Sequence, residues 1–144
     1  MKKIVFVCLG NICRSPMAEF VMKELDQGES LHIESRATSS WEHGNPVHQG
    51  TQKILRTYAI SFDSSKGSQQ ISQADFEFFD LVVGMDESNV EDLLQISAGH
   101  YDDKIKLFRP GGVPDPWYTG DFEETYKLVT AGCRDWLQWI KDRQ

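Results

Sequence analysis

One stretch near the N-terminus constrains the fold of this 144-residue chain most: KIVFVCLGNICRSPMAEF. Its apolar run, Ile4–Val7, is typical of a strand that is buried on both faces. A short loop follows, and Ser15 and Pro16 then predict a helix start, with Ser15 as the N-cap and Pro16 in the first helical position. The pattern therefore predicts a strand that ends at Cys8, a tight loop, and a helix that begins next to Arg14.

The predicted loop has the chemistry of an oxyanion site. Successive backbone N–H groups in such a turn point into one concavity, and the helix dipole adds partial positive charge. Arg14 offers a planar guanidinium that matches phosphate oxygens. Such surroundings lower the pKa of a thiol to roughly 3.5–7.5, and only the thiolate is a nucleophile. A cysteine at the end of an apolar strand is usually a small buried hydrophobe, but its spacing from Arg14 favours a nucleophilic Cys8.

Strand and helix patterns alternate along the rest of the chain. Apolar or alternating runs predict strands at residues 4–7, 32–37, 81–83 and 105–108. Helix starts are predicted after Ser15, Asn45-Pro46, Ser72 with Asp75, Asp86, and Asp121 with Glu124. The alternation predicts an α/β fold with a doubly wound parallel sheet and right-handed crossovers. In such a sheet, ligands bind outside the carboxyl ends of the strands, where Cys8, Gly84-Met85 and the loop from 109 to 120 all lie.

Composition limits the classes of partner and compartment. The net charge of -7 argues against nucleic acid or an anionic membrane as the principal partner. The three cysteines form neither a disulfide framework nor a common zinc spacing, so we expect no metal and no cofactor. No run approaches the roughly 18 apolar residues of a membrane span, and the start lacks a signal-peptide cleavage site. We expect one domain over residues 1–144, in a reducing cytoplasm where Cys8 stays a thiol.

Three motifs together resemble the low-molecular-weight protein tyrosine phosphatases. The stretch CLGNICRSPMAEF is similar to the phosphate loop of that family, and MDESN at 85–89 and DPWY at 115–118 follow in the family's order. The resemblance covers most of the chain. It implies a metal-independent hydrolase for phosphotyrosine in proteins, a four-stranded sheet in the order 2-1-3-4, and a monomer.

The resemblance also implies a role for individual residues. Cys8 would be the nucleophile that forms a cysteinyl-phosphate, and Arg14 would bind the phosphoryl oxygens. Asp115 would protonate the leaving group and then activate water as a base. Ser15 would donate a hydrogen bond to the Cys8 sulfur. The remaining residues expected to bind phosphate or support the loop are Leu9, Gly10, Asn11 (through Ser35), Ile12 and Cys13.

Aromatic residues indicate the class of substrate. Trp41, Trp117 and Tyr118 are expected to build a deep slot that suits a phenyl phosphate and exceeds the reach of phosphoserine. Both tryptophans fall in predicted loops, where burial is less expected. A relative that acts on phosphoarginine carries Thr where this chain has Ile12, so Ile12 favours phosphotyrosine. Phosphate and other oxyanions are then expected inhibitors, and whether Tyr118 is itself phosphorylated stays open.

Two positions leave alternatives open. The family often carries a histidine about four residues before the Gln70-Ile71 pair, where it supports the loop, and this chain has Lys66 instead. Support of the loop on that side is therefore an open question. Cys13 is either a small buried loop residue or, as the resemblance implies, the partner of Cys8 in a reversible disulfide that protects against overoxidation. Cys133 lies on the apolar stripe of the last predicted helix.

Three rival functions are weighed against this interpretation. Arsenate reductases share the fold and the loop, but they need resolving cysteines downstream, and residues 81–95 contain none. A phosphoarginine phosphatase is disfavoured by Ile12 and by the second aromatic residue after Pro116. A phosphoprotein-binding module would keep the anion site without the chemistry, and the presence of both Cys8 and Asp115 argues against it.

Overall fold

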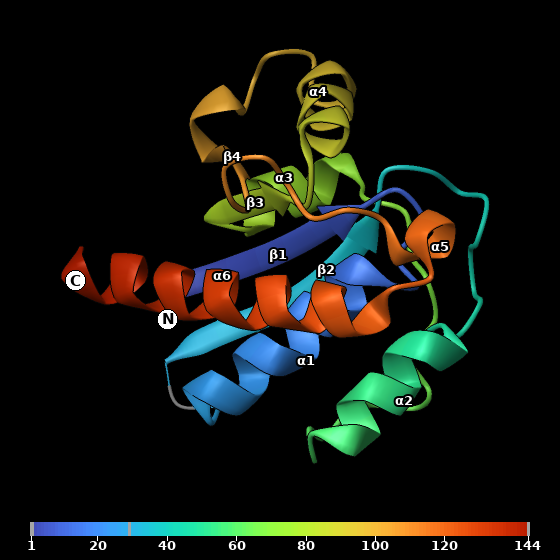
Figure 1. Ribbon diagram of the computed structural model, residues 1–144. Coiled ribbons are helices and arrows are strands. Elements are labelled where there is room, and N and C mark those ends of the chain that lie inside the picture. Colours follow the sequence, from blue (N-terminus) through green and yellow to red (C-terminus); the bar gives the residue numbers. More distant parts are fainter. Residues whose placement is uncertain (1, 29, 144) are drawn as a thin grey trace.

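A parallel four-stranded sheet forms the centre of the computed structural model, which describes residues 2–28 and 30–143 (Figure 1). Its strands are β1 (Lys2–Cys8), β2 (Leu31–Ala37), β3 (Leu81–Gly84) and β4 (Ile105–Leu107). They lie in the order β2-β1-β3-β4, and every neighbouring pair is parallel. The predicted α/β class and the strand order 2-1-3-4 are therefore confirmed. The alternating strand β2 lies at an edge, as its pattern indicates.

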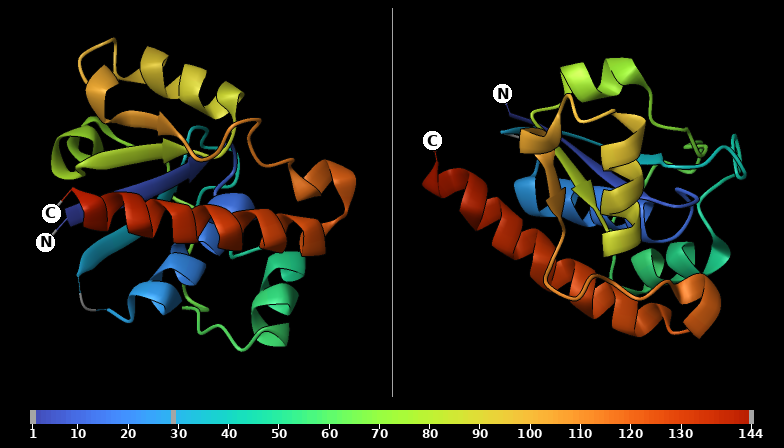
Figure 2. Two further views of the ribbon diagram at one scale, coloured as in Figure 1. Left: turned by 60° about the vertical axis from the view of Figure 1, so that its left-hand side comes forward. Right: turned by 90° about the horizontal axis from the view of Figure 1, so that it is seen from above.

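Helices cover both faces of the sheet. They are α1 (Arg14–Asp26), α2 (Gln49–Thr57), α3 (Gln73–Phe78), α4 (Glu87–Ile96), α5 (Pro116–Thr119) and α6 (Phe122–Asp142), with a 3₁₀ turn at Asp102–Lys104. Helices α1 and α6 pack on one face, and α3 and α4 pack on the other (Figure 2). Within residues 2–28 and 30–143, no helix is both long enough and apolar enough to cross a membrane.

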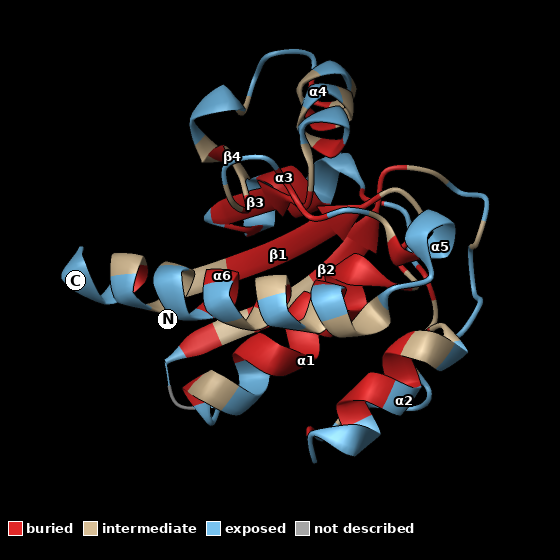
Figure 3. Cartoon of the chain, in the orientation of Figure 1, coloured by how far each residue is buried: buried red, intermediate tan, exposed pale blue. Residues whose placement is uncertain are grey.

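The side chains of β1 explain why this strand is central. Ile4 and Phe6 belong to the core between the sheet and α1 and α6, whereas Val5 and Val7 belong to the core beneath α3 and α4. All four side chains are 0% exposed. Figure 3 shows the same strand buried along most of its length. The unbroken apolar run therefore supplies two cores at once, and it ends at Cys8 on the carboxyl edge of the sheet.

Several predicted helix starts are confirmed. The Ser72 and Asp75 side chains form a reciprocal capping box at α3. Asp86 caps α4 by accepting from the Asn89 backbone N–H, and Asp121 caps α6 by accepting from that of Glu124. These caps depend on side chains only three residues from their partners, which is why the sequence reveals them.

Other predicted helix boundaries are wrong, because tertiary contacts override the local pattern. Helix α1 begins at Arg14 after Cys13, so Ser15 is a helical residue and its hydroxyl contacts the Cys8 sulfur instead of capping. Helix α2 is capped by His48, since residues 45–46 pair with residues 67–68 in a neighbouring loop. The predicted loop from 109 to 120 contains the short helix α5, which the Asp115 side chain caps.

Candidate active site

The loop from 8 to 14 curves around the sulfur of Cys8. The backbone N–H of Asn11 donates to Cys8 Sγ at 3.3 Å, and Ser15 Oγ lies 3.0 Å from the same sulfur. Asn11 has a φ of 56°, a left-handed conformation that asparagine tolerates better than most residues. That turn aims its N–H at the sulfur. These two contacts fix where the sulfur lies, with its polar neighbours on the side of the loop.

Arg14 connects this loop to two other loops at the carboxyl edge of the sheet. Its Nη1 donates to Asp86 Oδ2 at 2.6 Å and to the Val113 carbonyl oxygen at 2.9 Å, and its Nη2 lies 3.4 Å from Asp115 Oδ2. Burial opposes the positive charge, but the Cys8 thiolate and the carboxylates of Asp86 and Asp115 raise the pKa of the guanidinium above its ordinary value. Arg14 is therefore a fixed, buried cation beside the sulfur.

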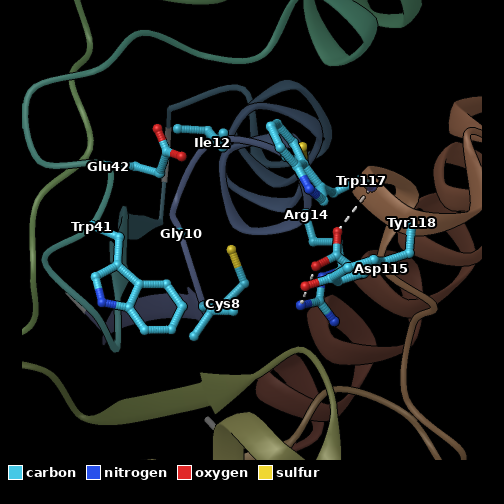
Figure 4. Close-up of a pocket in the computed structure, with 11 residues that line it drawn as sticks. Cys8, Gly10, Ile12, Arg14, Trp41, Glu42, Asp115, Trp117 and Tyr118 are labelled. Carbon is cyan, nitrogen blue, oxygen red and sulfur yellow. Dashed lines mark hydrogen bonds and ion pairs between the residues drawn. The ribbon is translucent and has the colours of Figure 1, made fainter.

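Asp115 lies at the start of α5, next to the guanidinium. Its Oδ1 accepts from the Trp117 backbone N–H at 3.0 Å, while its Oδ2 faces Arg14. The side chain is 21% exposed, so the carboxyl group is open to a molecule that enters the site. Figure 4 shows the carboxyl group of Asp115 beside Arg14, across from the Cys8 sulfur.

A cavity of about 230 Å³ opens above the sulfur. The rings of Trp41 and Trp117 stand on opposite sides of it (Figure 4). They are 76% and 57% exposed, and Tyr118 is 78% exposed, so the aromatic residues form the mouth and the polar groups form the floor. The residues that line the cavity are Cys8, Leu9, Gly10, Ile12, Cys13, Arg14, Trp41, Glu42, Asp115, Trp117 and Tyr118.

Asn11 and Ser15 lie behind this cavity, where they brace the loop. Asn11 Nδ2 donates to Ser15 Oγ at 2.8 Å and to Ser35 Oγ at 3.0 Å, so the expected pairing with Ser35 is present. Ser35 in turn donates to Glu19 Oε1 at 2.5 Å. Because the amide supplies both of its hydrogens, the hydroxyl hydrogen of Ser15 remains for the Cys8 sulfur, its nearest other partner.

Lys66 completes the support of the loop on the side that the sequence leaves open. Its Nζ donates to Asn11 Oδ1 at 3.1 Å and to the Gly67 carbonyl oxygen at 3.3 Å. The Gln69 backbone N–H donates to the same Asn11 oxygen at 3.1 Å. Burial lowers the pKa of the Lys66 ammonium below its ordinary value.

Cys13 has a different environment from Cys8. It is 4% exposed, and burial, followed by the nearby Cys8, raises its pKa to about 12. Its carbonyl oxygen accepts from Thr51 Oγ1 at 3.2 Å. A thiol with such a pKa stays protonated at neutral pH and is a slow nucleophile in disulfide formation. The protective disulfide with Cys8 stays a prediction.

Three residues of the site were not identified from the sequence. Glu42 lines the cavity next to Trp41, and its side chain packs 3.3 Å from where a Cβ on Gly10 would lie. Asp86 holds Arg14, although the sequence indicates only a helix cap. Its place after β3, at the same sheet edge as Cys8, is the signal that could have revealed this contact. Glu19 gives no such signal, because its contact with Ser35 depends on packing between α1 and β2.

The comparisons with known proteins agree with this geometry. A family model described as Low molecular weight phosphotyrosine protein phosphatase matches residues 3–144. The curated Bacillus subtilis protein YfkJ, a low molecular weight protein-tyrosine-phosphatase, is 40% identical over 100% of this chain and 99% of its own length.

Solved structures give the same result. SP-PTP, a low molecular weight protein tyrosine phosphatase from Streptococcus pyogenes, is 62% identical, with a TM-score of 0.96 over 97% of this chain and 93% of that one. Vibrio vulnificus Wzb, solved in complex with benzylphosphonate, is 26% identical, with a TM-score of 0.85 over 95% and 97% of the two chains. This chain therefore belongs to the low molecular weight phosphotyrosine protein phosphatase family and is a low molecular weight protein-tyrosine-phosphatase.

Proposed function

We propose that this phosphatase hydrolyses phosphotyrosine in proteins through a cysteinyl-phosphate on Cys8, with Asp115 as general acid and then general base. One observation carries the proposal: a hydrogen-bonded sulfur, a buried guanidinium and a partly open carboxyl group meet in a single aromatic-walled cavity. These are the nucleophile, the anion clamp and the proton donor that a phosphate monoester requires.

In the first step, the Cys8 thiolate attacks phosphorus and the bond from phosphorus to the tyrosyl oxygen breaks. The leaving phenolate takes its proton from the carboxyl group of Asp115. Backbone N–H groups of the loop and Arg14 stabilise the negative charge that spreads over the equatorial oxygens, and this charge is largest in the transition state. Because Nη1 is held by Asp86 and Val113, the guanidinium meets the phosphoryl group in a fixed orientation.

In the second step, water attacks the phosphorus of the cysteinyl-phosphate. The Asp115 carboxylate, left ionised by the first step, accepts a proton from that water. The bond from phosphorus to sulfur breaks, and inorganic phosphate and the Cys8 thiolate are released. The Ser15 hydroxyl, 3.0 Å from the sulfur, stabilises the departing thiolate by donating a hydrogen bond.

The cavity walls support an aromatic substrate. A phenyl ring would lie between Trp41 and Trp117, whose rings stand on opposite sides of the Cys8 sulfur (Figure 4). Aromatic pairs prefer stacked or edge-to-face contacts that add to simple burial. The shorter phosphoserine side chain would leave these walls without contact when its phosphate reaches the floor.

The experiment compares turnover of phosphotyrosine, phosphoserine and phosphoarginine peptides of one sequence, each with and without a chelator. We expect turnover of phosphotyrosine alone, unchanged by the chelator and competitively inhibited by phosphate and vanadate. Cys8→Ser is expected to abolish turnover. Preference for phosphoarginine would change the substrate class, and substantial activity of Cys8→Ser would refute the nucleophile.

A further inference from the structure

The first turn of α2, with its cap His48, contacts the loop from 8 to 14, here called the phosphate loop. One contact comes from the helix backbone and one from a side chain. The His48 backbone N–H donates to the Ile12 carbonyl oxygen at 2.8 Å. Thr51, which is fully buried, donates from Oγ1 to the Cys13 carbonyl oxygen at 3.2 Å. Two consecutive carbonyl groups of the phosphate loop are therefore fixed to one helix terminus.

The same turn contacts the loop that carries Asp115, through the imidazole ring of His48. This ring meets Trp117 edge to face, with centroids 5.6 Å apart and planes at 80°. It also stacks on Phe122, with centroids 5.1 Å apart and planes at 19°. Trp117 belongs to α5 and Phe122 opens α6, so the ring packs against residues on either side of the α5 C-terminus.

The orientation of the ring is set by the helix cap. His48 Nδ1 accepts from the Gly50 backbone N–H at 2.9 Å, which fixes the plane of the imidazole. Gly50 also makes room for the stack, because a Cβ there would lie 2.5 Å from the Phe122 ring. Asparagine, aspartate and serine are the usual N-caps, and none of them carries an aromatic ring. A histidine at this position therefore supplies a contact that the cap alone does not need.

Trp117 connects His48 to Asp115. Its backbone N–H donates to Asp115 Oδ1 at 3.0 Å, so a shift of Trp117 moves the carboxyl group. Trp117 is 57% exposed and lines the cavity, and the His48 ring, which is not among the lining residues, is a contact that restrains the indole. We propose that His48 is a positioning residue for proton transfer: its ring holds Trp117, and through Trp117 it holds the Asp115 carboxyl group above the Cys8 sulfur. The inference rests on the proposed function, because it requires Asp115 to be the acid.

Two substitutions separate the two roles of His48, the ring contacts and the hydrogen bond that caps α2. His48→Asn keeps an N-cap acceptor and removes the ring, whereas His48→Phe keeps a ring against Trp117 and Phe122 and removes the acceptor. The readout is kcat/KM, which includes every step through departure of the leaving group, for phenyl phosphate and for p-nitrophenyl phosphate. The first substrate has a poor leaving group that needs the acid, and the second has a good one.

For His48→Asn we expect kcat/KM to fall about tenfold on phenyl phosphate and less than about twofold on p-nitrophenyl phosphate, because a misplaced acid affects only the first. Its inhibition constant for inorganic phosphate should match the wild type, whereas its melting temperature should fall because the ring contacts with Trp117 and Phe122 are lost. For His48→Phe we expect wild-type discrimination between the two substrates and a lower melting temperature, because the helix loses its cap.

Asp115→Ala, alone and combined with His48→Asn, distinguishes failure of this inference from failure of the proposed acid. In the Asp115→Ala background, His48→Asn should cause no further loss, since both changes act on one proton transfer. The inference is overturned if His48→Asn affects both substrates equally or neither, if His48→Phe reproduces its loss, or if the two losses add. If Asp115→Ala itself shows no dependence on the leaving group, the acid assignment falls and the inference falls with it.

Discussion

Asn11 connects the phosphate loop to the rest of the molecule by using its entire hydrogen-bonding capacity. Its amide nitrogen donates to Ser15 and Ser35, and its carbonyl oxygen accepts from Lys66 and from the Gln69 backbone. These contacts fix the left-handed backbone that points its N–H at the Cys8 sulfur. A change at a residue outside the cavity therefore alters the donor geometry around the Cys8 sulfur.

We predict that Lys66→Met lowers kcat/KM for phosphotyrosine about tenfold. Hydrogen bonds that involve a charged group contribute ~1.5–3 kcal/mol, and a tenfold effect corresponds to about 1.4 kcal/mol. Methionine retains much of the apolar stem and loses the ammonium group. Lys53→Met, at an exposed position on α2, is the matched control and should leave the kinetics unchanged. Wild-type kinetics for Lys66→Met would show that the Gln69 N–H alone is enough to hold Asn11.

We predict that Asp115→Ala lowers kcat/KM for phenyl phosphate by about 10²–10⁴, the usual contribution of a general acid. The loss on p-nitrophenyl phosphate should be much smaller, because nitrophenolate leaves without a proton. Asp121→Ala is the control, since Asp121 is also an aspartate helix cap but lies outside the cavity lining. An equal loss on both substrates would remove Asp115 as the acid.

Placement of residues within one short stretch could be predicted from the local pattern, and Asp115 and the pairing of Asn11 with Ser35 came from the resemblance, whereas the long-range contacts of Lys66 and Asp86 were not predicted. Cys8 and Arg14 stand in one short loop, and the cavity contains both of them together with Asp115, as expected. The contact of Lys66 with Asn11 spans 55 residues, and that of Asp86 with Arg14 spans 72. No periodicity encodes either pair; for Asp86 the one signal is its place after β3 at the same sheet edge as Cys8, and Lys66 lies in a polar loop that gives no such signal.

At Gly132 in helix α6, helix propensity and core packing favour different residues. Gly132 lies in the interior of this helix and faces the sheet, and a Cβ there would lie 2.3 Å from the Phe108 ring. Alanine favours helix over glycine by about 1 kcal/mol. The glycine therefore lies where packing against Phe108, just after β4, outweighs helix propensity, and the periodic pattern of α6 does not indicate this.

We predict that Gly132→Ala destabilises the protein by about 1–3 kcal/mol, because an overpacked core has to displace the Phe108 ring. Urea unfolding followed by circular dichroism measures the change. Ala131→Gly, at the exposed neighbouring position, calibrates the propensity effect alone and should cost about 1 kcal/mol. A more stable Gly132→Ala variant would mean that the ring moves at little cost.

For the molecule as a whole, buried thiols make the free energy of unfolding depend on pH in the alkaline range. Burial raises the pKa of Cys133 far above its ordinary value of 9.0, and it raises that of Cys13 to about 12. The folded protein therefore keeps these protons at pH values where the unfolded chain releases them. This contribution to stability is fully present below about pH 9 and is lost as the pH rises toward the folded-state pKa.

We predict that between about pH 9 and about pH 10 the wild type loses stability more steeply than Cys133→Ala. The difference should approach 1.4 kcal/mol per pH unit, roughly the value for one titrating group. Urea unfolding under reducing conditions at a series of pH values measures both slopes. The cavity left by alanine lowers the variant's stability at every pH, so only the slopes are compared. Equal slopes would place the Cys133 thiol in a hydrated environment.

The most direct measurement of the proposed chemistry is to trap the covalent intermediate. Wild-type enzyme is mixed with a phosphotyrosine peptide, quenched with acid during turnover, digested and mapped by mass spectrometry. The mechanism predicts one phosphoryl group on the peptide that contains Cys8, and none on that peptide in Cys8→Ser. Turnover without a phosphorylated Cys8 peptide, or with the phosphoryl group on another residue, would contradict it.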